Sequence, residues 1–228
     1  MRELSEQALA TLMKGSSTIE EDAFGIKVAK LGDGSFLKLY RRKRLFSSAL
    51  WQPPAERFAR NAERLNELGI RAPGIVDTFN VPERLLNGVL YTPLPGDTLR
   101  NLWKLASVQE RALEVEGFGR FLGELHGLGV YFRSLHLGNV LKLPDGRLGL
   151  IDLSDMRISG RPLPNWKRKR NVRHMLRYQL DAHWLATLHL EELLRGYASY
   201  AGESATQALR SAIGALRPSI PQGASNTP

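Results

Sequence analysis

The chain has 228 residues, which is enough for one two-lobed domain or two small domains, and 43% of them are hydrophobic, as expected of a packed core. It has no cysteine, which excludes disulfides and zinc–thiolate sites, and no apolar run approaches the ~18 residues of a membrane-spanning helix. The net charge is +9, and nine cations fall in two clusters: Arg41–Arg44, and Lys167, Arg168, Lys169, Arg170 and Arg173.

This basicity is local, because the remainder of the chain is formally balanced. Local positive charge indicates an anionic partner such as phosphates, lipid headgroups or nucleic acid. The alternative is two solvated surface patches without a specific ligand. The first residues carry acids and no apolar signal core, so we expect a cytoplasmic protein.

The N-terminal part predicts several strands around one helix. Residues 4–14 have a modest apolar stripe of helical spacing, followed by a break at Gly15. Two strands, 24–31 and 35–41, flank the turn Gly32-Asp33-Gly34, and a helix opens at Pro53-Pro54 and runs to about Leu68. Two more strands are expected over 70–80 and 88–92. We therefore assign 1–23 as a helix and lead-in and 24–95 as a strand-rich lobe.

The segment Thr92-Pro93-Leu94-Pro95-Gly96 predicts the boundary to a helical part over 96–216. Thr98 is expected to cap a helix over 99–105, and Ser107 a long helix over 108–127. Further helices are expected near 170–198 and 203–215. Residues 217–228 are rich in Pro, Gly, Ser and Asn and are predicted to be disordered. The fold class is α+β.

The most informative pattern lies between residues 131 and 155, which predict a loop, a hairpin and a second loop. Asn139 precedes one apolar strand, Pro144-Asp145-Gly146 forms a turn, and the returning strand leads into Asp152. Because a hairpin returns its two ends to one place, Asn139 and Asp152 are predicted to be neighbours. An amide oxygen beside a carboxylate suits Mg²⁺. Alternatively, Asn139 only closes a loop and Asp152 is a turn residue.

Lys38 is the second candidate for chemistry. It lies in a strand with the apolar neighbours Leu37 and Leu39, and a buried ammonium without a counter-charge is costly. The pattern therefore predicts either a functional lysine with an acidic partner or an outward lysine on an edge strand that continues into Arg41.

The run Phe132-Arg133-Ser134-Leu135-His136-Leu137-Gly138-Asn139, followed by Ile151-Asp152, resembles the catalytic and metal-binding loops of the protein-kinase-like fold. The resemblance is to its small bacterial branch, the lipopolysaccharide-core sugar kinases and the toluene tolerance proteins, with the pattern H-x-D-L-H-x-G-N and then I-D-x-x-D. It covers about residues 24–200. The first histidine of the pattern falls on Phe132, and the aspartate that acts as base falls on Ser134.

The resemblance implies a bilobal kinase-like domain that binds ATP and Mg²⁺. Lys38 would hold nucleotide phosphates and pair with a helix glutamate, for which Glu63 is the candidate, and Asn139 and Asp152 would hold the metal. Because the serine at the base position has no titratable group near neutral pH, three interpretations follow for Ser134. Asp155 replaces the base, the enzyme is slow, or the site binds nucleotide without transferring phosphate.

The expected function is ATP-dependent phosphorylation of a sugar hydroxyl on an anionic glycolipid or sugar-phosphate acceptor. The basic stretch from Lys167 would hold this acceptor, with peripheral contact with the inner membrane surface, and Trp166 would lie at that interface or in the core. The alternative is a nucleotide-binding pseudokinase with a regulatory or scaffolding role in envelope stress or assembly. An RNA-associated kinase-like subunit is less favoured, because no aromatic residues interleave the basic ones.

Overall fold

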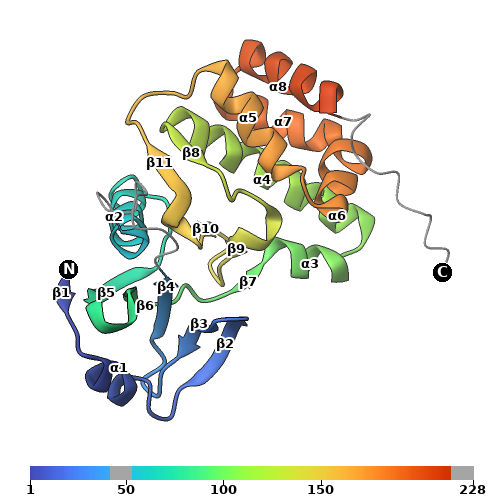
Figure 1. Ribbon diagram of the computed structural model, residues 1–228. Coiled ribbons are helices and arrows are strands. Elements are labelled where there is room, and N and C mark those ends of the chain that lie inside the picture. Colours follow the sequence, from blue (N-terminus) through green and yellow to red (C-terminus); the bar gives the residue numbers. More distant parts are fainter. Residues whose placement is uncertain (42–52, 217–228) are drawn as a thin grey trace. The chain divides into compact units, whose positions relative to one another are not determined.

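The computed structural model describes residues 1–41 and 53–216, which form two compact units (Figure 1). The first contains Met1–Pro95 and Gly149–Asp155, and the second contains Gly96–Leu148 and the chain from Met156 onward. The first is rich in strands and the second mostly helical, which confirms the α+β class. The predicted disordered tail and the basic residues 42–44 lie outside the described residues.

The first unit is built on a six-stranded sheet in the order β1-β5-β6-β4-β3-β2 (Figure 1). β1 runs parallel to β5, and the other neighbours are antiparallel. The strands are β1 (Arg2–Glu3), β2 (Ser17–Asp22), β3 (Gly25–Lys30), β4 (Phe36–Arg41), β5 (Gly74–Val81) and β6 (Leu86–Thr92). The sequence did not predict β2, because all six of its residues are exposed and no apolar alternation marks it.

The two faces of this sheet are covered differently. On one face Leu37 and Leu39 pack with Phe79 against helix α1 (Glu6–Leu12), which contributes the buried Leu9. The other face is covered by α2 (Pro54–Glu67), whose buried side chains include Phe58. The alternation of β4 therefore sends Lys38 to the α2 face, away from the Leu37–Leu39 core.

The second unit contains six α-helices and a short π-helix among its described residues. They are α3 (Leu99–Leu105), α4 (Val108–Gly127), α5 (Asn165–Met175), α6 (Gln179–Ala182), the π-helix His183–Leu188, α7 (Leu190–Ala201) and α8 (Glu203–Leu216). The expected caps are confirmed: Thr98 Oγ1 accepts a hydrogen bond from the Asn101 amide (3.2 Å), and Ser107 forms a capping box with Glu110. The helix expected near 170–198 is instead divided into α5, α6, the π-helix and α7, and it begins at Asn165, directly after Pro164.

Short strands complete the unit. β8 (Val130–Phe132) pairs with β11 (Met156–Ile158), and β7 (Asp97–Thr98) pairs with β9 (Val140–Lys142). The turn predicted at Pro144-Asp145-Gly146 is present, because the Leu143 amide donates to the Arg147 carbonyl (2.9 Å). The chain then leaves the unit within β10 (Leu148–Leu150).

The packing of α4 on α7 depends on glycines. A Cβ atom on Gly196 would lie 1.9 Å from the Glu116 carbonyl oxygen, and one on Gly119 would lie 2.2 Å from the Leu193 carbonyl oxygen. The two helix backbones therefore touch directly, and no side chain fits between them at these points.

A buried histidine lies beside this helix pair. His126 Nδ1 is 2.9 Å from the Tyr197 hydroxyl, and Nε2 is 3.3 Å from Asn171 Oδ1. Burial, followed by the nearby charge of Arg168, lowers the pKa of His126 to about 3. The ring is therefore neutral at neutral pH. Its Nδ1 can accept a hydrogen bond from the Tyr197 hydroxyl while its Nε2–H donates one to Asn171 Oδ1.

This histidine predicts a loss of stability in acid. The folded pKa lies below the ordinary value of 6.5, so the unfolded chain takes up a proton that the folded unit does not. The contribution of His126 is complete above about pH 6.5 and decreases as the pH falls toward 3, with roughly 2 kcal/mol lost at pH 5. We expect urea unfolding of His126→Gln to depend less on pH between 7.5 and 5 than that of the unchanged chain. Equal pH dependence in both proteins would contradict this assignment.

Candidate functional site

Lys38 is the centre of a polar cluster in the first unit. Register places it between Val28 of β3 and Val89 of β6, and its side chain is only 11% exposed. Its ammonium Nζ lies 2.5 Å from Asp152 Oδ1 and 5.7 Å from the centroid of the Tyr40 ring. The carboxylate supplies the counter-charge that a buried ammonium requires. Of the two predictions for this lysine, the functional one with an acidic partner therefore fits the geometry.

Asp152 occupies a special backbone position. Its φ is +58°, in the left-handed region that L-residues other than glycine, asparagine and aspartate rarely adopt. Its side chain is 41% exposed, although one oxygen is engaged by Lys38. Strained backbone of this kind persists where surrounding contacts hold it, and it clusters at functional sites.

Helix α2 supplies contacts that hold the backbone after Asp152. Asn61 Nδ2 donates to the Leu153 carbonyl (2.7 Å), and Arg57 Nε donates to the Ser154 carbonyl (3.0 Å). These two donors are four residues apart and so lie on the same side of the helix. The short 3₁₀ turn Leu153–Asp155 is thus fastened to α2 by two side chains.

The charge of Asp152 reaches the neighbouring aromatic residues. Burial raises the pKa of Tyr40 well above its usual value, and the negative charge of Asp152 raises it further. Burial and the same carboxylate also raise the pKa of Tyr91. Both phenols therefore stay neutral at neutral pH, so neither is an anionic partner for the Lys38 ammonium.

The turn between β2 and β3, which could cover phosphates, is not rich in glycine. It consists of residues 23–24, including the exposed Phe24, and Gly25 is already the first residue of β3. The Phe24 amide already donates to Asp22 Oδ1 (2.9 Å), so it is not directed at a ligand. A bound phosphate would depend on Lys38 more than on backbone amides.

The predicted pairing of Glu63 with Lys38 does not form in this structure. Lys38 pairs with Asp152, and Glu63 is exposed on α2. The reason is the helix rotation: the buried stripe of α2 contains Ala62 and Leu65, and Glu63 follows Ala62 by about 100° around the axis. The α2 side chains that reach the Asp152 segment are instead Arg57 and Asn61.

The second unit contains the loop with Ser134 and Asn139. Asn139 Nδ2 donates to the Ser134 carbonyl (2.9 Å), and its own amide donates to the His136 carbonyl (2.9 Å). These bonds fix the buried Asn139 side chain, and its amide oxygen points away from the Ser134 carbonyl. Asn139 does close the loop, and the other interpretation, that its oxygen also binds metal, is compatible with this orientation.

A buried carboxylate organises the same loop. Asp181 on α6 is fully buried, binds Arg100 with both oxygens (each 2.8 Å), and accepts from the Leu137 amide (2.9 Å). His136 Nδ1 accepts from the Gly138 amide (3.1 Å) and lies 3.3 Å from Arg100. A Cβ on Gly138 would lie 2.8 Å from the Arg100 guanidinium, which explains the glycine. The contacts of His136 are therefore with the loop itself and with Arg100.

Asn139 belongs to the second unit and Asp152 to the first, and their predicted proximity stays a prediction. Asp155, the candidate substitute for the base, is the half-buried last residue of the 3₁₀ turn in the first unit. Within residues 1–41 and 53–216, no cluster of three or more His, Asp or Glu side chains could hold a metal alone. Mg²⁺ usually takes one or two protein carboxylates and completes its shell with phosphates and water, so the 41% exposed carboxylate of Asp152 is a suitable ligand by itself.

The sequence did not identify Arg100, Asp181, Arg57 and Asn61. Asp181 was recognisable from the sequence, because it is the first acidic residue after Asp155. A single carboxylate following so basic a stretch is a candidate for a buried ion pair. The α2 donors had no such signal, since Arg57 and Asn61 have the composition of an ordinary polar helix face.

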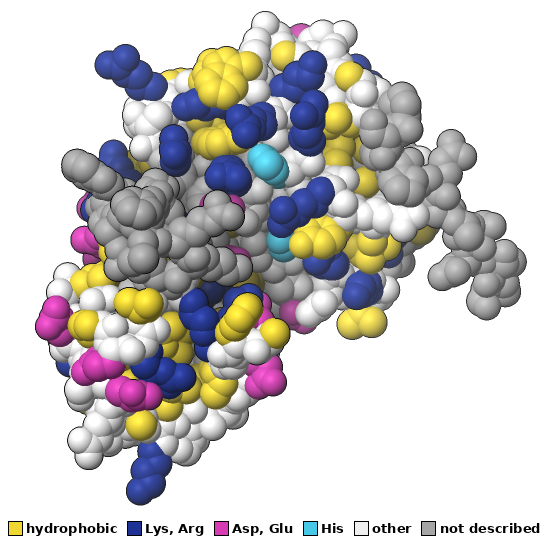
Figure 2. Space-filling model, viewed as in Figure 1, with side chains coloured by type: hydrophobic (Ala, Val, Ile, Leu, Met, Phe, Trp, Pro, Cys, Tyr) yellow, Lys and Arg dark blue, Asp and Glu magenta, His cyan; other side chains and the backbone are white. Residues whose placement is uncertain are grey.

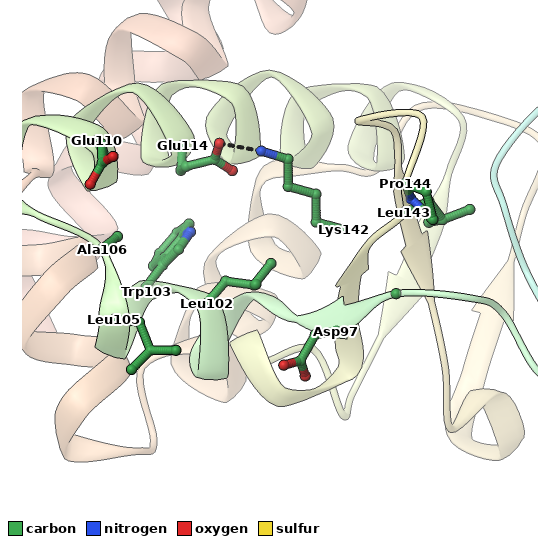
Figure 3. Close-up of a pocket in the computed structure, with 11 residues that line it drawn as sticks. Asp97, Leu102, Trp103, Leu105, Ala106, Glu110, Glu114, Lys142, Leu143 and Pro144 are labelled. Carbon is green, nitrogen blue, oxygen red and sulfur yellow. Dashed lines mark hydrogen bonds and ion pairs between the residues drawn. The ribbon is translucent and has the colours of Figure 1, made fainter.

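The second unit also has an open cavity of about 580 Å³ beside α3, α4 and β9 (Figure 3). Leu102 and Trp103 form its apolar wall, and Glu114 reaches across to Lys142, with Oε1 and Nζ 2.5 Å apart (Figure 3). Glu110 adds a second carboxylate. With Asp97, three acids face one paired lysine, which does not suit phosphates, so the Lys38 cluster is the better candidate for a nucleotide.

No protein-family model matches the chain, and no curated protein matches it significantly in sequence. Across the described residues, no helix has both the length and the apolar composition needed to cross a bilayer.

Proposed function

We propose that the chain is a kinase-like phosphotransferase that binds ATP with Mg²⁺ and phosphorylates a sugar hydroxyl on an anionic acceptor, as the lipopolysaccharide-core sugar kinases do. The observation that carries the proposal is the ion pair of the nearly buried Lys38 with Asp152, a carboxylate held at positive φ and still 41% exposed. A structural ion pair needs neither the strained backbone nor the exposed oxygen.

In this proposal Lys38 turns from Asp152 to the nucleotide phosphates and neutralises part of their charge. Asp152 and Asn139 would hold Mg²⁺ through their oxygens, and the metal would supply further neutralisation of the phosphates. The α2 donors Arg57 and Asn61 keep the segment after Asp152 in place during the exchange. Positioning and charge neutralisation are the main requirements of phosphoryl transfer.

The acceptor hydroxyl forms a new bond to the terminal phosphorus while the bond from that phosphorus to ADP breaks, and the hydroxyl proton must leave. Ser134 does not take this proton, because its hydroxyl has no basic form near neutral pH. Asp155 is the candidate acceptor of the proton, directly or through water. Without such a base we expect slow transfer.

Ser134 also favours a second candidate, a pseudokinase that binds Mg-ATP without transferring phosphate and acts in the regulation or assembly of the cell envelope. Its backbone carbonyl accepts a hydrogen bond from Asn139 Nδ2 (2.9 Å), and this contact does not depend on a carboxylate at position 134. Nucleotide binding through Lys38 and Asp152 is common to both candidates.

Two measurements on one sample distinguish the kinase from the pseudokinase. We expect Mg-ATP to raise the melting temperature of the full chain in a thermal-shift assay. If the chain is a kinase, the same sample also releases ADP in the presence of a phosphorylated sugar or lipopolysaccharide-core acceptor, and Asp155→Asn lowers that rate at least tenfold. Stabilisation without any ADP release identifies the pseudokinase, and no stabilisation contradicts both.

A further inference from the structure

Besides Arg41–Arg44, one longer stretch of the chain concentrates positive charge. Residues 156–180 contain eight lysines and arginines and no acid, which leaves 24 cations against 23 acids in the rest of the chain. None of these eight forms an ion pair within the described part of the chain, whereas eleven other cations do. Nearly all of the net charge of +9 is thus uncompensated and local.

Helix α5 has a buried inner face and an exposed outer face. The inner face carries Asn171, Val172 and Met175, which are buried where α5 packs on α8 and β8. Arg168 belongs to this side, because it donates to the Leu163 carbonyl (2.7 Å) and the Tyr197 hydroxyl (2.7 Å). Its charge therefore has a structural use.

The outer face is cationic and includes a tryptophan. Trp166, Arg170 and Arg173 follow at intervals of four and three residues and are exposed, and Lys169 lies beside them. Trp166 is 61% exposed, which is unusual for so large an apolar side chain. Figure 2 shows lysine and arginine side chains gathered over α5.

Helix stability does not explain these cations. The first turn of α5 has no acid and its N-cap, Pro164, makes no side-chain hydrogen bond, yet Lys167 and Arg168 lie there. Positive charges near a helix N-terminus oppose the helix dipole and destabilise the helix. The dipole therefore disfavours Lys167 and favours Arg173 in the last turn, so it does not account for the outer cations as a group. Their exposure without ion pairs favours a role in binding.

The aromatic residues distinguish between two kinds of anionic partner. The Lys167 ammonium lies 5.5 Å from the centroid of the Trp166 ring, and the guanidinium carbons of Arg100 and Arg177 lie 4.3 and 5.1 Å from that of Tyr178. Helix α5 contains a single tryptophan and no other Phe, Tyr or Trp, so it has no row of rings on which successive nucleic-acid bases would stack. A tryptophan among lysines and arginines instead suits the headgroup region of a bilayer.

We propose that the outer face of α5, with Trp166 at its start, docks the protein on an anionic lipid bilayer. The cations are attracted to the negative surface and Trp166 enters the headgroup layer, while the inner face keeps its contacts with α8. This proposal is independent of the nucleotide chemistry, so either can fail without the other.

Vesicle sedimentation tests it with the full chain. We expect binding to phosphatidylcholine vesicles that contain about one third phosphatidylglycerol, little binding to pure phosphatidylcholine, and weaker binding as salt rises. Lys169→Gln/Arg170→Gln should lower the partition coefficient by about 25-fold, because each cation near the surface contributes about fivefold. Trp166→Ala should also lower the partition coefficient several-fold.

The matched control is Lys104→Gln/Arg120→Gln, which removes the same charge from exposed positions of α3 and α4 and should change binding less than threefold. An equal loss in the control pair would show that only net charge matters and would overturn the proposal. Failure to bind the anionic vesicles would also overturn it, as would tighter binding of single-stranded RNA at the same salt concentration. All four cations are exposed, so unchanged melting temperatures are expected for both variants.

Discussion

Replacement of Asp181 by alanine is expected to destabilise the helical unit by about 3–5 kcal/mol, the usual effect of removing one partner of a buried ion pair. The Asp181 side chain is completely buried. Its removal leaves both the guanidinium of Arg100 and the amide of Leu137 without their carboxylate hydrogen-bond acceptor. Urea unfolding monitored by circular dichroism measures this loss.

The second partner provides the control for this experiment. In Asp181→Ala/Arg100→Met both charges are absent, so no buried charge is left alone, and we expect the double variant to be more stable than Asp181→Ala. A loss below about 1 kcal/mol in the single variant would show that Asp181 does not organise the Ser134–Asn139 loop.

Replacement of Lys38 by methionine is expected to lower phosphate transfer at least 100-fold if the chain is a kinase, and to weaken Mg-ATP binding by about 10- to 150-fold in either case. The second range corresponds to a charge-assisted hydrogen bond of about 1.5–3 kcal/mol. Stability should change by about 1 kcal/mol or less, because the Asp152 carboxylate left behind is 41% exposed and can be solvated. Isothermal titration calorimetry and an ADP-release assay measure the two effects.

Lys30→Met is the matched control, since Lys30 is an exposed lysine at the end of the adjacent strand β3. It should leave both ATP affinity and turnover unchanged. If Lys38→Met binds Mg-ATP as tightly as Lys30→Met, then Lys38 has only a structural role.

The sequence predicted those features that depend on local patterns. The alternation of β4 placed Lys38 opposite the Leu37–Leu39 core, and the need of a buried ammonium for a counter-charge predicted an acidic partner. The caps at Thr98 and Ser107 follow from the preference of hydroxyl side chains for free helix amides.

The features that were missed depend on contacts between distant parts of the chain. Glu63 was chosen as the partner of Lys38, but Asp152, 114 residues from Lys38, takes that place. The assignment of Gly149–Asp155 to the first unit likewise depends on hydrogen bonds such as that of the Leu150 amide with the Arg71 carbonyl (2.9 Å). Local propensity and hydrophobic periodicity contain no information on such pairs.

Titration of ATP into the unchanged chain and into Asp152→Asn, with and without Mg²⁺, tests most directly whether Lys38 and Asp152 form a nucleotide site. Asparagine tolerates the left-handed backbone at this position and removes only the charge. We predict that Mg²⁺ strengthens ATP binding to the unchanged chain at least tenfold and has no such effect on Asp152→Asn. ATP binding that is absent from the unchanged chain, or equally Mg²⁺-dependent in both proteins, would contradict the assignment.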